Sequence, residues 1–309
     1  NLYFDHHLPK AADAGNSLRA MPGAFTDDKL SFMFQSWIIS MFFDCPTGLG
    51  LHCPNTTALK KVRSAVESGD IVWHAFPHNA QLEIMGETMI HAGLQMTRDV
   101  DVLFKNQRVK TTLSQRDVPG MPRSIVSLLN RSGVSAISIG ANDGSTPPKL
   151  PSTFVWEDLD SNTSILGLFN WPGYGHLGEQ VVVPNFKHAL VYNWNGDNAG
   201  PYDDDGYRQN WKAIQQMFPH AQVYASTLDN FTSKLEEIRD LLPVITADIG
   251  DTWVYGVPSD PQKVARMAAM NRVWTLMGNN TDNQDLVLRN ATRFALKLGE
   301  HTDGKDVKS

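Results

Sequence analysis

Short apolar runs recur along the chain at the length of buried strands and predict a core built from strands. The predicted strands cover residues 32–39, 71–76, 111–115, 135–140, 189–194, 222–227 and 244–249. Amphipathic segments between several of them predict helices over residues 58–69, 82–104 and 123–133. Two more helices are expected to begin near Asp229 and Ser259, which are residues suited to N-caps. Strands that alternate with helices across short turns indicate parallel strands joined by crossover helices.

Two segments depart from this alternation. Residues 153–175 read as two strands around an Asp-Ser-Asn turn, which predicts a β-hairpin inserted at the rim of the main domain. From residue 262 to residue 300 the pattern is helical without further strands. The sequence therefore predicts a main α/β domain over residues 1–258 and a C-terminal helical segment over residues 259–309.

Three aspartates lie where an apolar run gives way to a loop marked by Gly or Pro: Asp117, Asp197 and Asp251. A carboxylate beyond the end of a core strand is costly to desolvate and adds nothing to packing. In barrels of alternating strands and helices, that rim is where catalysis occurs. The alternative is that these residues only form turns, since Asp before Pro-Gly and the segment Asn-Gly-Asp-Asn are good turn sequences.

Aromatic residues accompany the third aspartate. Asp248 and Asp251 flank a Gly, and Trp253 and Tyr255 follow them. Aromatic faces that stack on sugars, beside acids that bind hydroxyl groups, are typical of a carbohydrate cleft. An aromatic corner of the core would give the same pattern.

His74 and His78 flank Phe76-Pro77 at the end of a predicted strand. His-x-x-x-His is a metal-binding spacing on a helix, but Pro77 prevents a regular helix here. We therefore expect these two histidines to contact substrate rather than zinc.

Bulk properties narrow the class of protein. With 309 residues and 41% hydrophobic content, the chain can bury one barrel-sized core. The net charge is −6 and the chain has no basic run, so nucleic acid is not expected as a partner. No apolar stretch reaches the ~20 residues of a membrane span.

Six Asn-x-Ser/Thr acceptors and a single pair of cysteines favour a secreted protein. The acceptors are Asn55, Asn130, Asn162, Asn230, Asn279 and Asn290. Cys45 and Cys53 are close enough to bridge a short loop, and a disulfide there would fit an oxidising compartment. The alternative is two free thiols and unused acceptors.

Several motifs together resemble a known family. The strings WHAFPHNAQLE, QRDVPGMPRSIVSLL, GANDGSTPP, GDNAGP and ADIGDTWVYGVPSDPQKVA, in this order, are similar to the domain-of-unknown-function family 5054. That family looks like a branch of glycoside hydrolase family 38, the α-mannosidase superfamily. The match covers most of the chain. The resemblance implies a (β/α)7-type parallel barrel followed by the start of a helical bundle.

The resemblance also implies roles for particular residues. Asp117, in Gln-Arg-Asp-Val-Pro-Gly, is similar to the aspartate that is both nucleophile and zinc ligand in those mannosidases, apart from one extra residue before Pro. Asp197, in Gly-Asp-Asn, resembles their acid/base. His301, in Glu-His-Thr-Asp, is the nearest match to a zinc-ligating histidine. The residues expected to contact the sugar are His74, His78, Arg116, Asn198, Asp248, Asp251, Trp253 and Tyr255.

The superfamily's first strand supplies two more zinc ligands from a His-x-Asp pair, which this sequence does not contain in a matching position. The chain opens on Asn1 rather than Met, and its first residues already predict a helix. We therefore expect an N-terminal piece with the first barrel strand to be missing. The chain as given would keep at most Asp117 and His301 as zinc ligands, fewer than a catalytic zinc site needs.

The sequence thus predicts a carbohydrate-active hydrolase, with a zinc-dependent retaining glycoside hydrolase acting on an α-linked sugar as the first reading. Two carboxylates can carry out such hydrolysis, one at the sugar carbon and the other at the leaving oxygen. A metal-dependent carbohydrate deacetylase is the first alternative, because such enzymes also use Asp/His metal sites on seven-stranded barrels. A carbohydrate-binding protein without catalysis is the second.

Overall fold

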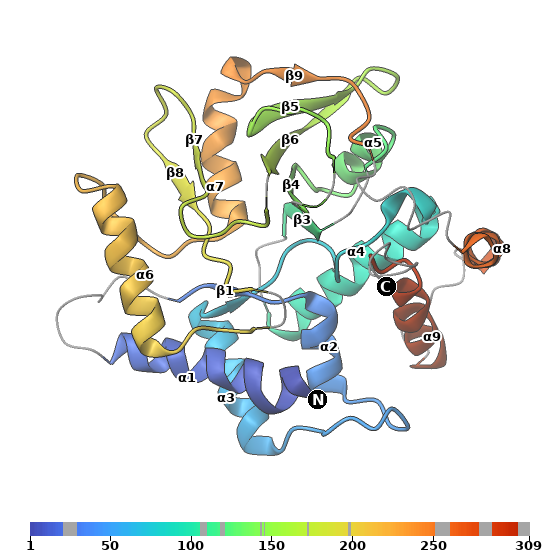
Figure 1. Cartoon of the computed structure of the whole chain (residues 1–309). Coiled ribbons are helices and arrows are strands. Elements are labelled where there is room, and N and C mark those ends of the chain that lie inside the picture. Colours follow the sequence, from blue (N-terminus) through green and yellow to red (C-terminus); the bar gives the residue numbers. More distant parts are fainter. Residues whose placement is uncertain are drawn as a thin grey trace. The chain divides into compact units, whose positions relative to one another are not determined.

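The computed structural model describes most of the chain (Figure 1). The described residues are 1–20, 30–105, 110–117, 121–142, 144, 146–171, 173–196, 199–250, 260–277 and 286–301. They form two compact units that alternate along the sequence. Unit 1 comprises Asn1–His74, Val100–Arg108 and Gly175–Lys234, and unit 2 comprises Ala75–Asp99, Val109–Tyr174 and Leu235–Ser309. Among the described helices, none combines the length and the apolar character of a membrane span.

Unit 1 is mainly helical. Its helical elements are η1 (Tyr3–His7), α1 (Leu8–Arg19), α2 (Ser36–Asp44), α3 (Thr56–Ser68) and α6 (Asp204–Met217), and α7 (Leu228–Leu235) begins in it. Two short strand pairs complete it: β1 (Phe32–Met33) parallel to β2 (Ile71–Val72), and β7 (Gln180–Val182) antiparallel to β8 (Ala189–Val191). Helix α3 shows why these boundaries form, because the Asn55 side chain accepts a hydrogen bond from the Ala58 amide and Gly69 ends the helix at φ 82°.

The apolar residues of unit 1 form their own core, which includes Leu8, Ile39, Phe42 and Ile71. Near it, the Cys45 and Cys53 sulfur atoms are bonded, as the short loop between them predicts. Of the six acceptor asparagines, Asn55, Asn130, Asn162 and Asn230 are exposed and Asn290 is half-buried, while Asn279 lies outside the described residues.

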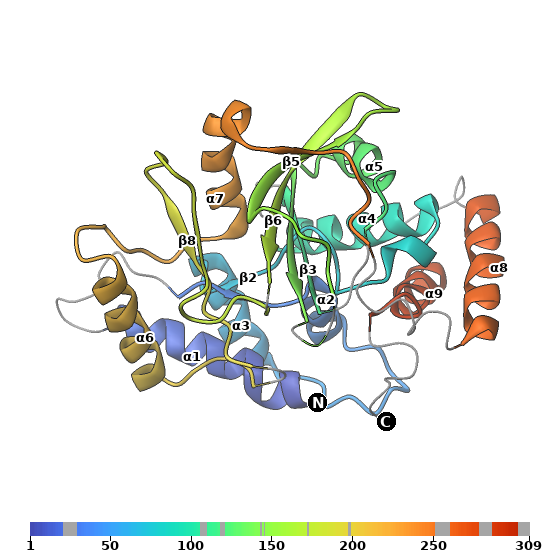
Figure 2. The ribbon, with the colours of Figure 1, turned by 45° about the horizontal axis from the view of Figure 1, so that its top comes forward.

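Unit 2 is built on a five-stranded sheet. Its strands are β3 (Thr112–Asp117), β4 (Ala136–Ala141), β5 (Thr153–Asp158), β6 (Thr163–Asn170) and β9 (Val244–Ile245), in the order β3-β4-β6-β5-β9. β3, β4 and β6 run parallel, β5 is antiparallel to β6, and β9 is parallel to β5 (Figure 2). The carboxyl ends of β3, β4 and β6 therefore lie at one edge of the sheet, called the carboxyl edge below.

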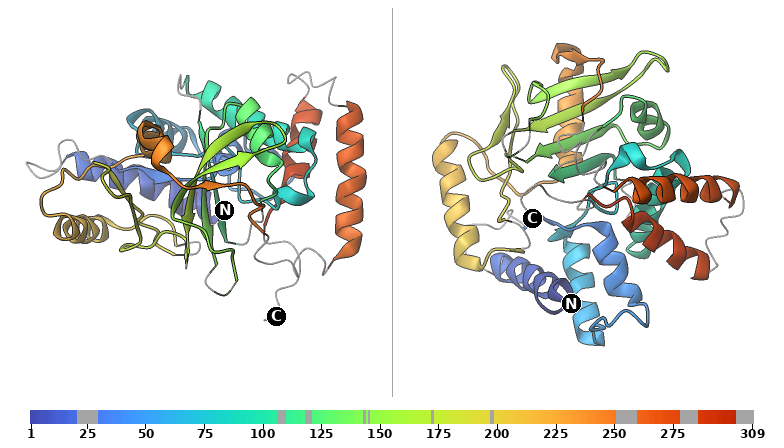
Figure 3. Two further views of the ribbon diagram at one scale, coloured as in Figure 1. Left: turned by 90° about the horizontal axis from the view of Figure 1, so that it is seen from above. Right: turned by 45° about the vertical axis from the view of Figure 1, so that its right-hand side comes forward.

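Helices and 3-10 turns complete unit 2. They are η2 (Leu82–Ile84), most of α4 (Glu87–Leu103), α5 (Ile125–Arg131), η3 (Glu236–Leu241), α8 (Pro261–Met277) and α9 (Leu286–Lys297). Figure 3 shows α8 and α9 beside each other, in the region that the helical pattern after residue 262 predicts. The core of this unit joins the sheet to α4 and α5 and contains Phe76, Leu113, Phe154 and Trp156.

The described strands make an open sheet and two separate strand pairs, so the predicted barrel is not what the structure shows. Within the five-stranded sheet, β3 and β9 are the two edge strands and do not pair with each other. The hairpin at 153–170 is part of this sheet and not an insertion on a rim, since β6 pairs directly with β4. The predicted boundary between residues 258 and 259 lies outside the described residues.

Two predicted strands are wrong. The apolar run at 32–39 gives a two-residue strand followed by helix α2, and residues 222–227 form no strand. A short apolar run is compatible with either a buried strand or a buried helix, so its periodicity does not decide between them. The three predicted helices at 58–69, 82–104 and 123–133 are confirmed by α3, by η2 with α4, and by α5.

Candidate active site

Asp117 is the last residue of β3 and lies on the carboxyl edge of the sheet in unit 2. Its φ is 89°, in the left-handed region that residues other than Gly rarely adopt. Such a conformation costs of order 1–3 kcal/mol and persists where surrounding contacts impose it. The backbone is held there by its neighbour β4, because the Asn142 amide donates to the Asp117 carbonyl at 2.8 Å.

Two side chains donate to the same oxygen of the Asp117 carboxylate. Asn142 Nδ2 lies 2.7 Å from Asp117 Oδ1, and the Tyr174 hydroxyl donates to the same atom. Asn142 Nδ2 also lies 2.5 Å from the Tyr174 hydroxyl oxygen, so the three groups form one cluster. Asn142 directly follows β4, and Tyr174 lies four residues beyond the end of β6. The carboxyl ends of three adjacent strands thus supply the acid and its two donors.

The second carboxylate oxygen faces a histidine from the C-terminal end of the described chain. His301 Nε2 lies 3.1 Å from Asp117 Oδ2, and His301 Nδ1 lies 2.6 Å from Glu300 Oε1. The His301 amide donates to the Asn79 carbonyl, and Ala80 and Glu300 form a β-bridge that fixes this segment. An imidazole therefore lies between two carboxylates, as an ion-paired triad.

The charges of this triad support each other. Burial raises the pKa of Asp117, but hydrogen bonds from His301, Tyr174 and Asn142 outweigh it and hold the pKa below its ordinary value. Burial lowers the pKa of His301, but the hydrogen bond to Asp117 and the charge of Glu300 outweigh it and raise the pKa to about 9. At neutral pH the site holds an ionised Asp117 beside a protonated His301.

Arg116 positions the segment that carries Tyr174. Its Nε donates to the Tyr174 carbonyl at 3.0 Å, and its Nη1 donates to the carbonyls of Gln115 and Ser138. Gly140 makes room for this arrangement, because a Cβ there would lie 2.5 Å from Arg116 Cδ and 3.0 Å from Tyr174 Cα. The contacts described here give Arg116 a structural role at the edge of the site.

His78 lies in the interior of unit 2 and is 0% exposed. Its Nδ1 is 2.9 Å from the Asn79 carbonyl, while Nε2 is buried without a hydrogen-bond partner among the described residues. Burial lowers the pKa of His78 to about 4, so the ring is neutral. Gln115 holds the segment that follows His78, since its Oε1 accepts a hydrogen bond from the Ala80 amide at 2.7 Å.

Of the remaining predicted residues, the structure describes two, His74 and Asp248. His74 is buried and ends the first segment of unit 1. Asp248 is exposed in unit 2, where its Oδ1 accepts from the Arg123 amide at 2.5 Å, just before helix α5. Asp197, Asn198, Asp251, Trp253 and Tyr255 lie outside the described residues.

Asn142, Tyr174 and Glu300 were not predicted from the sequence. The signal that selected Asp117, a polar residue just beyond an apolar strand, also applies to Asn142 after β4 and to the loop after β6. Glu300 precedes His301 directly, and a carboxylate beside a candidate histidine is a usual orienting partner. If the search for polar residues just beyond a strand had covered every parallel strand, it would have found Asn142 and Tyr174.

The described residues do not by themselves complete a zinc centre. Asp117 Oδ2 and His301 Nε2 are an oxygen and a nitrogen donor that suit zinc. A catalytic zinc site uses three protein ligands, and the described part of the chain contains no cluster of three His, Cys, Asp or Glu side chains placed to hold a metal ion. The pair supplies at most two of these three ligands.

Comparison with known proteins supports the fold. No family model and no curated protein matches the chain. An α-mannosidase from Enterococcus faecalis V583 is similar in structure, with a TM-score of 0.54 and 16% identity over 80% of this chain and 29% of its own. A 4-α-glucanotransferase from Thermococcus litoralis has a TM-score of 0.49 at 10% identity, over 88% of this chain and 41% of its own. A glycosyl hydrolase family 38 protein from Enterococcus faecalis has a TM-score of 0.48 at 16% identity, over 79% and 27%.

The chain spans less than half of each of these structures. The similarity to the α-mannosidase supports the fold alone, which in this chain is a mixed α/β fold with a mainly parallel sheet. The narrower resemblance, to the family of unknown function, has no family-model match behind it.

Proposed function

We propose that this chain carries part of the active site of a retaining glycoside hydrolase that acts on an α-linked sugar. One observation carries the proposal: an ionised aspartate, Asp117, is held in a strained conformation at the carboxyl ends of the three parallel strands β3, β4 and β6. In open α/β sheets, ligands bind beyond the carboxyl ends of the strands. Backbone strain and shifted pKa values both cluster at functional sites.

The proposed chemistry starts at Asp117. Its carboxylate attacks the anomeric carbon, the glycosidic C–O bond breaks, and the leaving oxygen takes a proton from a second acid. The resemblance assigns that acid to Asp197. Water then attacks the glycosyl-enzyme ester and gives a proton back to the same acid, which releases the sugar and restores the Asp117 carboxylate.

The donors around Asp117 suit this role. Asn142 and Tyr174 hold Oδ1 and orient the carboxylate, while Oδ2 is reached only by His301 among the interactions described above. Hydrogen bonds that lower the pKa of Asp117 keep it ionised and therefore nucleophilic. His301 would move away from Oδ2, or share it, when a sugar enters.

Zinc remains a proposal from the resemblance. When bound, zinc would supply a positive charge for sugar hydroxyls, and Asp117 and His301 are the two residues here that would hold it. Because these two donors are too few for a catalytic site, the steps above use no metal. Calorimetric titration of zinc into the chain and into His301→Gln measures whether the pair binds it at all.

The test is activity on a panel of aryl α-glycosides that begins with an α-mannoside, with Asp117→Ala and Asp197→Asn as the two variants. Both substitutions should strongly lower turnover, and external azide should restore it with a different product in each: a glycosyl azide of retained configuration for Asp197→Asn and one of inverted configuration for Asp117→Ala. Unchanged turnover in both variants would remove the proposed roles. Release of acetate from acetylated sugars would identify a deacetylase instead, and binding without turnover would identify a carbohydrate-binding protein.

We also propose that the protein is secreted. The bonded pair Cys45–Cys53 is typical of oxidising compartments, and the four exposed acceptor asparagines are accessible to glycosylation. Expression in a secreting eukaryotic host should give a protein whose mass falls on treatment with an N-glycanase. An unchanged mass would contradict glycosylation of these sites.

A further inference from the structure

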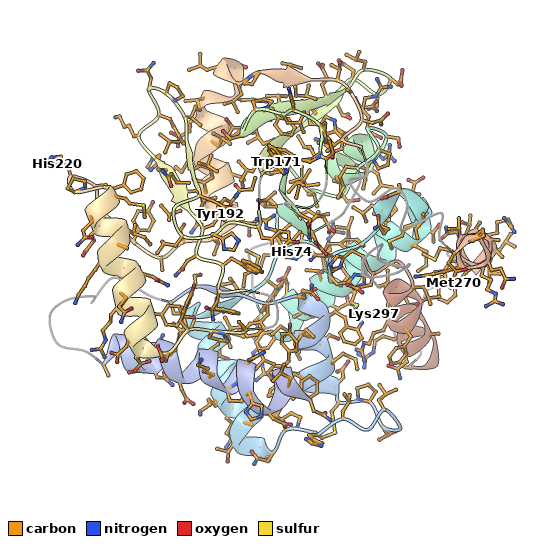
Figure 4. The ribbon with its side chains drawn as sticks, viewed as in Figure 1. His74, Trp171, Tyr192, His220, Met270 and Lys297 are labelled. Carbon is orange, nitrogen blue, oxygen red and sulfur yellow. A yellow bond between two sulfur atoms is a disulfide. The ribbon has the colours of Figure 1, made fainter. Side chains whose placement is uncertain are left out.

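Trp171 is an exposed tryptophan at the carboxyl edge of the sheet in unit 2 (Figure 4). It directly follows β6 and is 54% exposed. Of the tryptophans in the described part of the chain, it is the one that lies mainly in solvent. Tryptophan normally contributes a large buried area, so an exposed one at the edge of a candidate active site needs a reason other than packing.

The strand register places Trp171 level with Asp117. Asp117 pairs with Ala141 of β4, and Gly140, the residue before Ala141, pairs with Asn170 of β6. Trp171 therefore begins the loop beside Ala141, and the Gly173 amide donates to the Ala141 carbonyl at 3.0 Å. Two strand spacings separate β6 from β3, which is about 10 Å along the edge.

The same loop reaches the proposed nucleophile. It starts at Trp171 and ends at Tyr174, whose hydroxyl donates to Asp117. Arg116 holds the loop through the Tyr174 carbonyl. One segment therefore carries an exposed aromatic ring at its start and a donor to the catalytic carboxylate at its end.

We propose that Trp171 is a stacking platform for a sugar ring of the substrate, next to the ring that Asp117 attacks. The apolar face of a pyranose packs on an indole ring, and such contacts give affinity without charge. The separation along the edge places Trp171 beyond the ring at Asp117, so it would favour oligosaccharides over monosaccharides. This inference rests on the proposed function, because Asp117 fixes where the first ring lies.

The experiment measures binding separately from catalysis. Asp117→Asn, which should bind but not cleave, serves as the parent, and Trp171→Ala and Trp171→Phe are added to it. Leu159→Ala is the matched control, because Leu159 is 59% exposed on the turn after β5, at the opposite edge of the same sheet. The probes are methyl α-mannoside and an α-linked mannobiose, titrated by calorimetry. Thermal unfolding of each variant confirms that the fold is kept.

Trp171→Ala should weaken binding of the mannobiose by roughly 5- to 10-fold, the range of one aromatic contact. Binding of methyl α-mannoside should change less, Trp171→Phe should restore most of the affinity, and Leu159→Ala should bind like the parent. Equal affinities for the mannobiose in the parent and in Trp171→Ala would overturn the proposal. A parent that binds neither sugar would overturn it as well.

The outcome stays separate from that of the proposed function. If the full-length protein with Asp117 intact hydrolyses no glycoside, the hydrolase assignment fails. A selective loss of mannobiose affinity in Trp171→Ala would still show a stacking site in a carbohydrate-binding protein. If hydrolysis is confirmed while Trp171→Ala binds normally, only the stacking role is wrong.

Discussion

Asp117 and Asp158 are both the last residues of strands in the same sheet, and their surroundings differ completely. The Asp158 side chain is 7% exposed, 3.3 Å from Arg123 Nε, and accepts from the Ser161 hydroxyl in the turn to β6. The Asp117 side chain is 27% exposed and is contacted by Asn142, Tyr174 and His301. Asp158 stabilises the turn between β5 and β6, whereas Asp117 belongs to a charged cluster that is partly exposed to solvent.

The direction of the strand explains the difference. β5 is antiparallel to β6, so the end of β5 lies at the edge opposite the carboxyl ends of β3, β4 and β6. In open α/β sheets, ligands bind beyond the carboxyl ends of the parallel strands. An aspartate after a strand is therefore a candidate for catalysis when its strand runs parallel to its neighbours.

The largest expected effect is on activity, when each aspartate is changed to its amide. Asp117→Asn should lower kcat/KM at least about a thousandfold, because an amide cannot form the glycosyl ester. Asp158→Asn should keep the activity but lower the free energy of unfolding by about 1–3 kcal/mol, because a buried charged hydrogen bond is weakened. Steady-state kinetics and urea unfolding measure the two effects. Equal activities in the two variants would remove the distinction.

The resemblance named both Asp117 and His301, which are 184 positions apart in the sequence. The structure places His301 Nε2 3.1 Å from Asp117 Oδ2, and the roles of the two residues stay a prediction. The resemblance implied a closed barrel, but the hairpin at 153–170 joins the sheet through β6, and β3 and β9 are left as edge strands that do not pair with each other. Periodicity indicates which face of a strand is buried but not which strands are its neighbours. The sequence therefore did not predict at which edge of the sheet β5 ends and Asp158 lies.

Tyr174 shows a second limit of sequence reasoning. Its contact with Asp117 depends on the path of the loop after β6, which Arg116 and Gly140 fix by contacts that no motif encodes. Trp171 has the same origin, since its exposure follows from where β6 ends. Loops at the carboxyl edge are therefore where the structure adds most to the sequence.

A difference in pH dependence should also separate the two aspartates. The folded pKa of His301 is raised to about 9 from 6.5, so its contribution to stability is fully present below pH 6.5 and is lost as the pH rises through 9. The folded pKa of Asp117 is lowered, so its contribution is present above pH 4 and is lost as the pH falls. The ion pair therefore stabilises the fold most between about pH 4 and 6.5.

His301→Gln isolates the contribution of the ion pair. The unsubstituted chain should lose no more than about 3 kcal/mol of its free energy of unfolding between pH 6 and pH 10, since each pKa unit corresponds to about 1.4 kcal/mol. His301→Gln should not show this loss. In Asp158→Asn the free energy of unfolding should fall with pH as steeply as in the unsubstituted chain. Urea unfolding at a series of pH values measures both, and a His301→Gln slope identical to that of the unsubstituted chain would show that the pair contributes nothing.

Two glycines on neighbouring strands allow a test of whether turnover depends on the loop after β6, which carries Tyr174. A Cβ at Gly140 would press on Arg116 and Tyr174, and one at Gly167 would press on the Phe154 ring. Gly140→Ala and Gly167→Ala should each cost about 1–3 kcal/mol, the range for overpacking. Only Gly140→Ala should also lower kcat, because only it displaces the donor to Asp117. Similar kcat values in both variants would mean that the position of Tyr174 does not matter for turnover.

The smallest effect concerns Asp160, the exposed neighbour of Asp158. Asp160 Oδ2 lies 2.6 Å from Arg123 Nη2, closer than the 3.3 Å between Asp158 and Arg123, but the Asp160 side chain is 83% exposed. Exposed ion pairs contribute about 0–1 kcal/mol, because water screens the charges and both side chains lose freedom. Asp160→Asn should therefore cost less than Asp158→Asn in urea unfolding, despite its shorter distance to the same arginine. If Asp160→Asn cost more, distance rather than burial would decide which aspartates support the fold, and the contrast between Asp158 and Asp117 would need another cause.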